Sequence, residues 1–401
     1  MAGNSLLTID MITRKSLEIL ENNLVLSRNI NRQYDDSFAV EGAKIGSTLR
    51  IRLPDRALVT DGAALQVQDD NEQYTTLPVA SQKHIGINFT SAELTMQLDD
   101  FAERVLTPRI SQLASSVDAD LATVYKNVYN SVGTPGTVPG TSLVLLQGQQ
   151  KLNEYATPMN PRYATVNPAA NAGLVEGMKG LFNPTQTVSS QFKSGMMGTG
   201  VLGLEEVNMS QSIQVHTTGN WGTTITNTGT IAVQGQATLP ISFTGSGSTW
   251  KVGDVFTIAD CYAVNPQTRQ STGSLAQFVV TADLTATTTG TLQISPPIYT
   301  ASHALATVDT FPVAGKAVTM VGSPSKQYAQ NLVYHKDAFT LATADLLLPQ
   351  GVDMASRQVH NGISMRIVRQ YDINNDRMPC RVDVLYGFAA IRPVMAARIW
   401  G

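Results

Sequence analysis

The longest regular pattern in the chain covers residues 90–132, where apolar side chains recur every three or four positions. That spacing places them on one face of a helix. The phase slips once, at Thr107 and Pro108, and proline is favourable at the first position of a helix but not in its interior. The pattern predicts a short helix, a break, and a long helix over residues 108–131, on the order of 35 Å at ~1.5 Å per residue.

From Ser47 the period of the pattern changes to two, which is typical of a half-buried strand. Leu49, Ile51 and Leu53 alternate with Arg50 and Arg52, and apolar residues alternate again at Ile85, Ile87 and Phe89. The long polar segment between the two runs predicts an extended two-stranded arm rather than a tight hairpin. Because an isolated two-stranded ribbon is only marginally stable in water, we expect the arm to lie on another copy of the chain.

Other patterns organise the remaining parts of the first half. Residues 5–26 have roughly helical spacing, and we interpret residues 1–44 as an N-terminal arm, the alternative being an ordinary first helix of a globular domain. Residues 142–155 are expected to form a helix with Leu143, Leu146 and Leu152 on its apolar face. Residues 163–166 are expected to be a buried strand that leads into a turn and a helix, and residues 183–212 a loose, glycine-rich segment.

The composition shifts sharply between residues 215 and 319, where Thr, Gly, Val and Ser dominate and charge almost vanishes. Short alternating runs separated by turn residues predict a compact all-β barrel or sandwich, inserted into the main body. The clearest runs are 223–226, 237–241, 255–258, 277–281 and 291–294. After the insert we expect a strand at 331–335, a helical turn at 337–342, and paired strands at 364–369 and 380–386.

The totals narrow the classes of function. A chain of 401 residues is too long for one ordinary core, and only 15% of its residues are charged, against a usual share of about 25%. A polar but uncharged surface can be covered by a partner without stranding many charges, which favours assembly. The net charge of -3 and the lack of a dense basic cluster argue against sequence-specific DNA binding.

The chain has two distant cysteines, no basic leader and no long apolar run. We therefore expect a reducing compartment, and neither secretion nor membrane insertion.

Three motifs suggest chemistry only weakly. Gly198, Gly200 and Gly203 fit G-x-G-x-x-G without a helix start after them, residues 372–376 imitate a calcium loop without its glycine and glutamate, and His335 precedes Asp337 without a nucleophile. We predict no catalytic residue, no cofactor and no metal.

Several blocks of the second half resemble a known family. They are residues 262–273 with 277–281, 335–346, 368–376 and 383–387. Together with the order of elements in the first half, they resemble the coat proteins of short-tailed bacteriophages, which are major capsid proteins of the Hong Kong 97 type with an insertion domain.

The resemblance implies an α+β fold with an N-terminal arm (1–44), an extended loop (45–90), and a peripheral domain with a spine helix and the first part of an axial domain (91–213). An inserted β-barrel (214–321) and the remainder of both domains (322–401) would follow. It implies homo-pentamers and homo-hexamers in an icosahedral shell around double-stranded DNA, with a scaffolding protein and a portal at one vertex as partners, and it leaves open whether a decoration protein binds. Such a protein is assembled in the host cytoplasm and resides in the virion.

Six charged residues of the extended loop are the candidate assembly contacts: Arg50, Arg52, Arg56, Asp69, Asp70 and Glu72. Opposite charges on an arm that crosses a neighbour can fix its orientation and register, whereas solvated charges on an exposed hairpin would contribute little. Some shells of this type are crosslinked through a lysine of the loop, but no lysine lies between Lys44 and Lys83, so we predict a shell without crosslinks. The main alternative function is a β-rich fibre or adhesin module; an enzyme ranks third.

Overall fold

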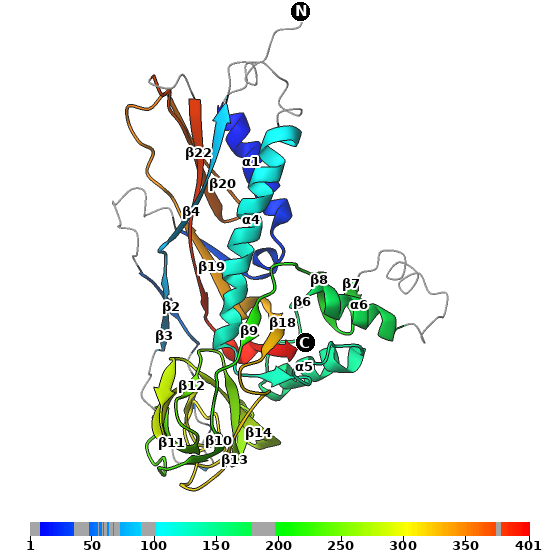
Figure 1. The fold of residues 1–401 in the computed structure, drawn as a ribbon, viewed down its shortest axis with the longest axis vertical. Coiled ribbons are helices and arrows are strands. Elements are labelled where there is room, and N and C mark those ends of the chain that lie inside the picture. The colour runs from blue at the N-terminus through cyan, green and yellow to red at the C-terminus, as the bar shows by residue number, and fades with distance from the viewer. Residues whose placement is uncertain are drawn as a thin grey trace, which may run out of the picture. The chain divides into compact units, whose positions relative to one another are not determined.

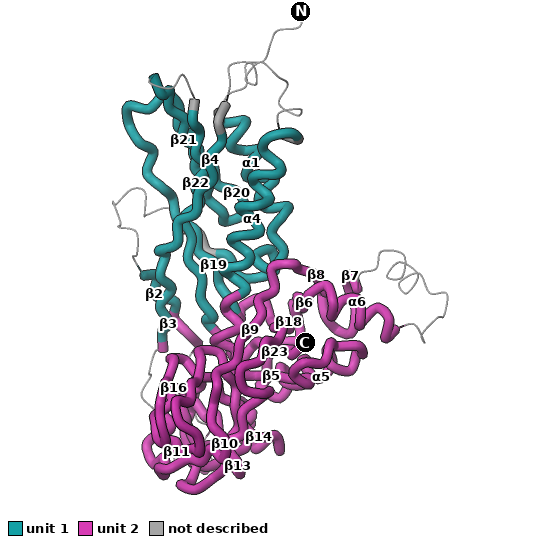
Figure 2. Tube along the Cα trace, in the orientation of Figure 1, with its two compact units in different colours: residues 1–51, 74–122, 339–391 teal, residues 52–73, 123–338, 392–401 magenta. Residues whose placement is uncertain are grey.

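The computed structural model describes residues 9–35, 48–54, 56–57, 59, 62–63, 67, 73–89, 102–178, 197–373 and 378–401. Two compact units are distinguished in Figure 2. The first combines residues 1–51, 74–122 and 339–391, and the second combines residues 52–73, 123–338 and 392–401. Each unit is built from segments that are far apart in the sequence.

The first unit is built on a six-stranded sheet. Its strand order is β1 (Asn31–Asp35), β19 (Phe339–Ala344), β22 (Met378–Ala390), β21 (Ile363–Arg369) and β20 (Met354–His360), and β4 (Ser81–Phe89) also pairs with β22. β1 and β19 are parallel, and the other neighbours are antiparallel. The predicted pairing of residues 364–369 with 380–386 is therefore confirmed.

The prediction of a helical turn at 337–342 is correct for residues 337–338 and wrong for residues 339–342. Lys336–Ala338 forms a short 3-10 turn (η6), but Phe339–Ala344 is strand β19, and all six of its residues are buried. A strand that is buried on both faces shows a continuous apolar run rather than alternation, so periodicity could not separate it from a helix.

The long helix of the sequence pattern is α4 (Thr107–Ala122), the cyan helix in Figure 1. Instead of a break, a π-helical turn (η3, Ala102–Leu106) leads directly into it, and this wider turn accommodates Pro108, whose ring lacks an N–H and clashes with a regular preceding turn. The helix ends earlier than predicted, because the chain tightens into a 3-10 turn (η4, Thr123–Asn127) and Ser131 already belongs to strand β5 (Ser131–Val132).

Helix α1 (Ile9–Asn23) packs against α4, β20 and β21. The chain that leaves α1 is held by Asp118 of α4, whose buried carboxylate accepts hydrogen bonds from the amides of Val25 (2.6 Å), Leu26 (3.3 Å) and Ser27 (3.2 Å) and from the Ser27 hydroxyl (2.8 Å). Burial raises the pKa of Asp118, while these four donors act in the opposite direction. The helix at the chain start is thus part of the first unit's core.

The predicted two-stranded arm exists with a different second strand. β2 (Thr48–Arg52) pairs with β3 (Tyr74–Pro78), whereas residues 81–89 form β4 and pair with β22 in the main sheet. Sequence alternation identified β2 and β4 but missed β3, the strand that pairs with β2.

The base of this ribbon lies against Gly387 of β22. A Cβ atom added at Gly387 would lie 2.1 Å from the Pro78 carbonyl oxygen, closer than any real contact. We expect Gly387→Ala to lower the free energy of unfolding by about 1–3 kcal/mol, the usual cost of overpacking. Gly86→Ala in β4 is the matched control, because a Cβ there would meet no atom within 4 Å. Urea unfolding of both variants, followed by circular dichroism, measures the difference, and equal midpoints would contradict it.

The second unit contains a sheet that carries the insertion. Its order is β5, β23 (Ala396–Trp400), β18 (Gln327–His335), β6 (Arg162–Val166), β8 (Leu204–Met209) and β7 (Gly198–Val201), and β9 (Val215–Thr217) also pairs with β18. β6 is the predicted buried strand, and Asn167 caps the following helix α6 (Pro168–Gly177) by accepting a hydrogen bond from the Ala170 amide. Of the segment predicted to be loose (183–212), residues 183–196 lie outside the described part of the chain, and residues 198–209 form the β7–β8 hairpin.

Helix α5 (Ser142–Glu154) is present as predicted, but only Leu152 of its three predicted apolar-face residues is buried. Leu143 and Leu146 are exposed, and the buried residues are Leu145, Gly148 and Leu152. A Cβ added at Gly148 would lie 3.4 Å from Val333 of β18, so the glycine allows the helix to approach the sheet closely. A face centred on glycine is invisible to a search for apolar periodicity.

All five predicted runs of the insert are strands, and they form one sheet. Its order is β10 (Thr223–Asn227), β11 (Gln236–Thr244), β16 (Thr289–Ile298), β14 (Ser271–Val280), β13 (Val255–Val264) and β17 (Val318–Met320). A bridge between Thr226 and Ala317, with a hydrogen bond from the Asn227 amide to the Lys316 carbonyl (2.9 Å), joins the first strand to the segment that enters the last, so the sheet is a nearly closed barrel. The inserted all-β barrel is confirmed.

Candidate assembly arm and the junction of the inserted barrel

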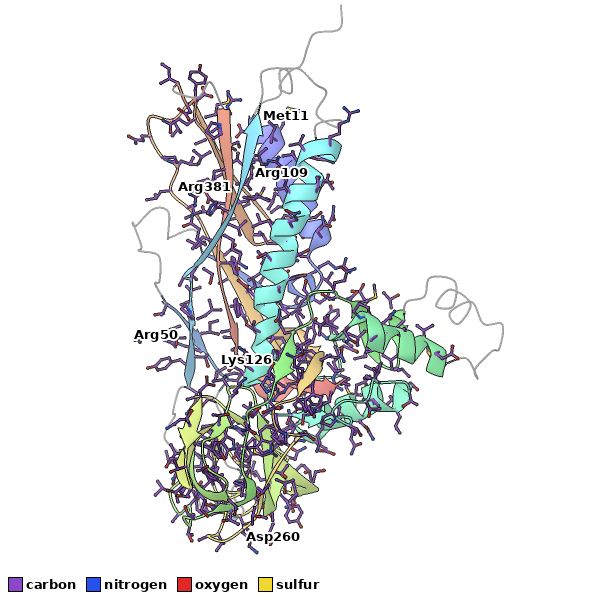
Figure 3. All side chains as sticks on the ribbon, viewed as in Figure 1. Met11, Arg50, Arg109, Lys126, Asp260 and Arg381 are labelled. Carbon is purple, nitrogen blue, oxygen red and sulfur yellow. The ribbon has the colours of Figure 1, made fainter. Side chains whose placement is uncertain are left out.

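The β2–β3 ribbon has two different faces. Arg50 and Arg52 are exposed, whereas Leu49 and Ile51 between them are half-buried, as the alternation predicted. The Arg50 guanidinium lies over the Tyr74 ring of β3, 5.1 Å from its centre, and Figure 3 labels Arg50 on this ribbon. A cation stacked on an aromatic face keeps its charge while losing part of its conformational freedom. The ribbon therefore presents ordered positive charge on one face.

Arg56 lies in a different setting. It lines a small pocket of about 60 Å³ in the second unit, together with Tyr129, Tyr155, Phe278 and Gln277. Burial raises the pKa of the Tyr129 phenol, and the charge of Arg56, an exposed residue at the edge of this pocket, acts against that shift. The sequence pattern groups Arg56 with Arg50 and Arg52, but the structure gives it aromatic neighbours within its own chain.

The acidic half of the predicted contact set, Asp69, Asp70 and Glu72, lies outside the described residues. The complementary pairing of these acids with the arginines of the loop therefore stays a prediction.

The barrel meets the sheet of the second unit through a buried hydrogen-bonded chain of three side chains. His216 Nε2 lies 2.8 Å from an Asp254 carboxylate oxygen, and His216 Nδ1 lies 3.1 Å from the Tyr125 hydroxyl. All contacts are satisfied when Nε2–H donates to Asp254 and the Tyr125 O–H donates to Nδ1. Burial raises the pKa of Tyr125 to about 12, so the hydroxyl keeps its proton.

Asp254 is also held by the backbone around it. Its carboxylate accepts from the amides of Gly219 (3.1 Å) and Lys251 (2.8 Å), and it is 1% exposed. Gly219 has to be a glycine here, because an added Cβ would lie 2.2 Å from the Thr249 carbonyl oxygen and 2.9 Å from the carboxylate itself. The aspartate thus ties the start of the insertion to the loop that precedes β13.

Arg398 of β23 completes the junction. It is fully buried, and its Nη1 donates to the Gly253 carbonyl (2.8 Å) and to Gln330 (3.4 Å). Its Nε and Nη2 have no hydrogen-bond partner among the residues that the structure describes, and the guanidinium lies over the rings of Tyr125 (5.7 Å) and Trp400 (5.4 Å). Burial lowers its pKa to about 9. Aromatic faces and the nearby Asp254 partly replace the water that this cation loses.

The hydrophobic core crosses the same junction. Tyr129, Tyr155, Tyr328 and Trp400 from the body belong to one buried cluster with the barrel residues around Phe256 and Phe278. Gln277 of β14 adds a reciprocal pair, since its amide donates to the Ser131 carbonyl (2.9 Å) and accepts from the Ser131 amide (2.7 Å). The barrel and the sheet of the second unit therefore share a core.

The sequence did not identify this junction. His216 is one of five histidines scattered along the chain, and its partners Asp254 and Tyr125 are 38 and 91 positions away. Sequence motifs describe neighbours along a chain, and no spacing rule links residues at such separations.

Both cysteines, Cys261 and Cys380, are buried, and burial raises each thiol pKa to about 12, so neither is a reactive thiolate at neutral pH.

The glycines of the G-x-G-x-x-G pattern do not form a nucleotide-binding turn. Gly200 and Gly203 lie in the β7–β8 hairpin, and no helix follows this hairpin to bind a phosphate at its N-terminus. Among the described helices, none is both long and apolar enough to cross a membrane.

Comparison with known proteins gives consistent matches over the whole chain. The family model described as "P22 coat protein - gene protein 5" matches residues 1–400. A curated relative, the "Major capsid protein" of Acyrthosiphon pisum secondary endosymbiont phage 1, is 22% identical over 426 residues and covers 100% of both chains.

Three solved phage structures are similar to this chain. That of Mycobacterium phage Che8 matches with a TM-score of 0.47 and 10% identity, covering 94% of this chain and 90% of that one. The capsid of cyanophage P-SCSP1u has a TM-score of 0.44 and 9% identity, covering 93% and 86%. The mature capsid of bacteriophage PhiM1 has a TM-score of 0.43 and 11% identity, covering 92% and 85%.

Proposed function

The chain belongs to the P22 coat protein family, and from that premise we propose that the β2–β3 ribbon is an assembly arm that lies on a neighbouring copy in the shell. Membership makes the chain a major capsid protein with the Hong Kong 97-type fold, whose copies associate to form the icosahedral shell of a phage. It is a structural protein of the virion and not an enzyme, and the fibre or adhesin alternative loses its basis.

One observation carries the proposed arm. Among the residues that the structure describes, the ribbon has two strands, and it exposes Arg50 and Arg52 on one face while Leu49 and Ile51 on the other are half-buried. Two-stranded ribbons are marginal alone, and apolar side chains gain stability when they are fully covered. A neighbouring copy would supply that cover, and the arginines would fix the orientation of the arm upon it.

The contact set of the arm is Arg50, Arg52 and Arg56, with Asp69, Asp70 and Glu72 as the acidic partners on the loop. The division into an N-terminal arm (1–44), extended loop (45–90), peripheral and axial segments (91–213 and 322–401) and barrel (214–321) belongs to the same proposal. Copies of the chain in pentamers and hexamers, a scaffolding protein and a portal are the partners that this role implies, beside packaged double-stranded DNA, and a decoration protein is a further candidate partner. Weak contacts repeated around closed rings suffice for a stable particle.

Charge reversal at Arg52 tests the arm. We expect Arg52→Glu to reduce the yield of closed shells roughly tenfold, because a loss of about 1.4 kcal/mol at an interface changes its equilibrium constant by that factor and every subunit carries the defect. The measurement is sedimentation and electron microscopy of particles assembled from purified protein with its scaffolding protein.

Lys251→Glu is the control, since Lys251 is an exposed residue of the barrel and the reversal changes net charge equally. Shells of normal yield and size from Arg52→Glu would remove the assembly role of the ribbon. An equal defect in both variants would assign the effect to net charge alone.

A further inference from the structure

The barrel is joined to its own subunit by a neck of two adjacent strands. β9 leads into the insertion and β18 leads out of it, and they pair antiparallel with His216 opposite Tyr328. With the Asp254 contacts and the shared core beside this neck, the barrel is fixed on the sheet of the second unit rather than tethered by a flexible linker.

The turn at residues 265–270, between β13 and β14, is held on two sides. Within it, the Asn265 side chain accepts from the amides of Gln267 (2.9 Å) and Thr268 (3.1 Å). Outside it, the Asn265 amide group donates to the Glu154 carbonyl at the end of α5 (2.8 Å). One side chain therefore shapes the turn and attaches it to the body, so residues on the turn are presented from a rigid base.

Arg269 on this turn reaches the extended loop. Its Nη2 donates to the Val59 carbonyl at 3.3 Å, and its backbone amide donates to the Asn265 carbonyl at 2.8 Å. Its φ of +57° is in the left-handed region, which costs energy for a residue with a Cβ atom. Arg56 of the extended loop provides a second attachment. It lines the same pocket as Tyr129, Tyr155 and Phe278.

We propose that the inserted barrel anchors the extended loop of its own subunit, with Arg269 as the positioning residue and the Arg56 pocket as the second attachment. The barrel then holds the loop at Arg56 and Val59 before any neighbour is present. A segment that is already ordered loses less conformational freedom when it binds, so the anchor favours assembly without adding a contact between subunits. The anchor itself is independent of the assembly role of the ribbon, and only its effect on shell yield rests on that role.

Spin labels on the full-length monomer test the anchor directly. Val59→Cys and Val215→Cys place labels on two exposed positions, one on the loop and one on β9, while the native Cys261 and Cys380 are buried and stay unlabelled. We expect a narrow distance distribution in the otherwise unchanged protein. Arg269→Ala, which keeps the Cβ atom and so the backbone strain, should lose that narrow population, and Arg56→Ala should lose part of it.

Lys316→Ala is the matched control, because it removes another cation from the barrel surface, one that pairs with the exposed Asp260 there. It should leave the distribution unchanged. A distribution in Arg269→Ala as narrow as in the parent protein would overturn the anchor, whatever happens to assembly. Broadening with normal shell yield would support the anchor and count against the assembly role of the ribbon, which separates the two proposals.

Discussion

Replacing Asp254 by alanine is expected to lower the free energy of unfolding of the second unit by about 3–5 kcal/mol, because it leaves several buried donors unpaired, each at a cost of about 1–3 kcal/mol. The Asp254 carboxylate accepts hydrogen bonds from His216 and from the amides of Gly219 and Lys251. Its negative charge also acts on the buried guanidinium of Arg398. Alanine would leave these donors without an acceptor and the Arg398 cation without a nearby opposite charge, and each loss is costly where water cannot enter.

Tryptophan fluorescence during urea unfolding suits this measurement. Trp221, Trp250 and Trp400 are the three tryptophans of the chain, and all of them belong to the second unit. The matched control is Asp260→Ala, because Asp260 lies in the same barrel (Figure 3) and also pairs with a cation, but its side chain is 64% exposed. Exposed pairs contribute ~0–1 kcal/mol. Similar effects of the two substitutions would contradict the importance of the buried junction.

The second large effect is expected at Asp383, in the first unit. Its carboxylate is fully buried and accepts from Arg366 (2.8 Å), Arg381 (2.6 Å) and Gln82 (3.2 Å). Asp383→Ala would leave two guanidinium groups facing an apolar methyl group. Because Arg381 is 49% exposed and water can reach it, we place the loss near the lower end of the range for buried pairs, about 3 kcal/mol.

Asp383 also predicts how stability depends on pH. Burial alone would raise the pKa of this carboxyl, but the hydrogen bonds and charges of Arg366 and Arg381 outweigh burial and hold the pKa below its ordinary value of 3.8. A lowered pKa in the folded state stabilises the fold above the pKa of the unfolded state, and this contribution is lost as the pH falls through the folded-state pKa. The parent protein should therefore lose stability below about pH 4, where unfolded aspartate titrates.

Hydrogen exchange of β21 and β22, measured by mass spectrometry between pH 3 and pH 6 after correction for intrinsic rates, reports on this region. Asp383→Asn should show higher exchange at pH 6 and lack the component of the acid response that Asp383 supplies. Asp353→Ala is the control, since Asp353 pairs with Arg369 in the same unit but is 39% exposed. An unchanged acid response in Asp383→Asn would rule out Asp383 as its source.

The surroundings of Asp383 and those of Asp254 differ in how much of them could be predicted from the sequence. Residues 383–387 carry part of the family resemblance and β21 and β22 show alternation, so the strand that carries Asp383 was predictable, but the convergence of Arg366 and Arg381 on it depends on their register in the sheet. For Asp254, His216 and Arg398 no local signal existed, because they come from two separate parts of an insertion and from the last strand of the chain.

By itself, the sequence determined the features that depend on local chemistry. The period of the apolar residues gave the helices α1, α4 and α5 and the strands of the barrel, the Asn167 cap and Pro168 gave the start of α6, and the distinctive blocks of the second half gave the family. These features can be read from the linear sequence because a helical turn, a strand pleat or a helix cap involves residues only a few positions apart.

Only the tertiary structure decided which elements meet. It paired β2 with β3 rather than β4, turned α5 about Gly148 rather than Leu146, and ended α4 early, where η4 places Tyr125 against His216. The physical reason is common to all three. Burial and pairing energies depend on surfaces contributed by distant segments, and those energies exceed the small local preferences that a sequence pattern records.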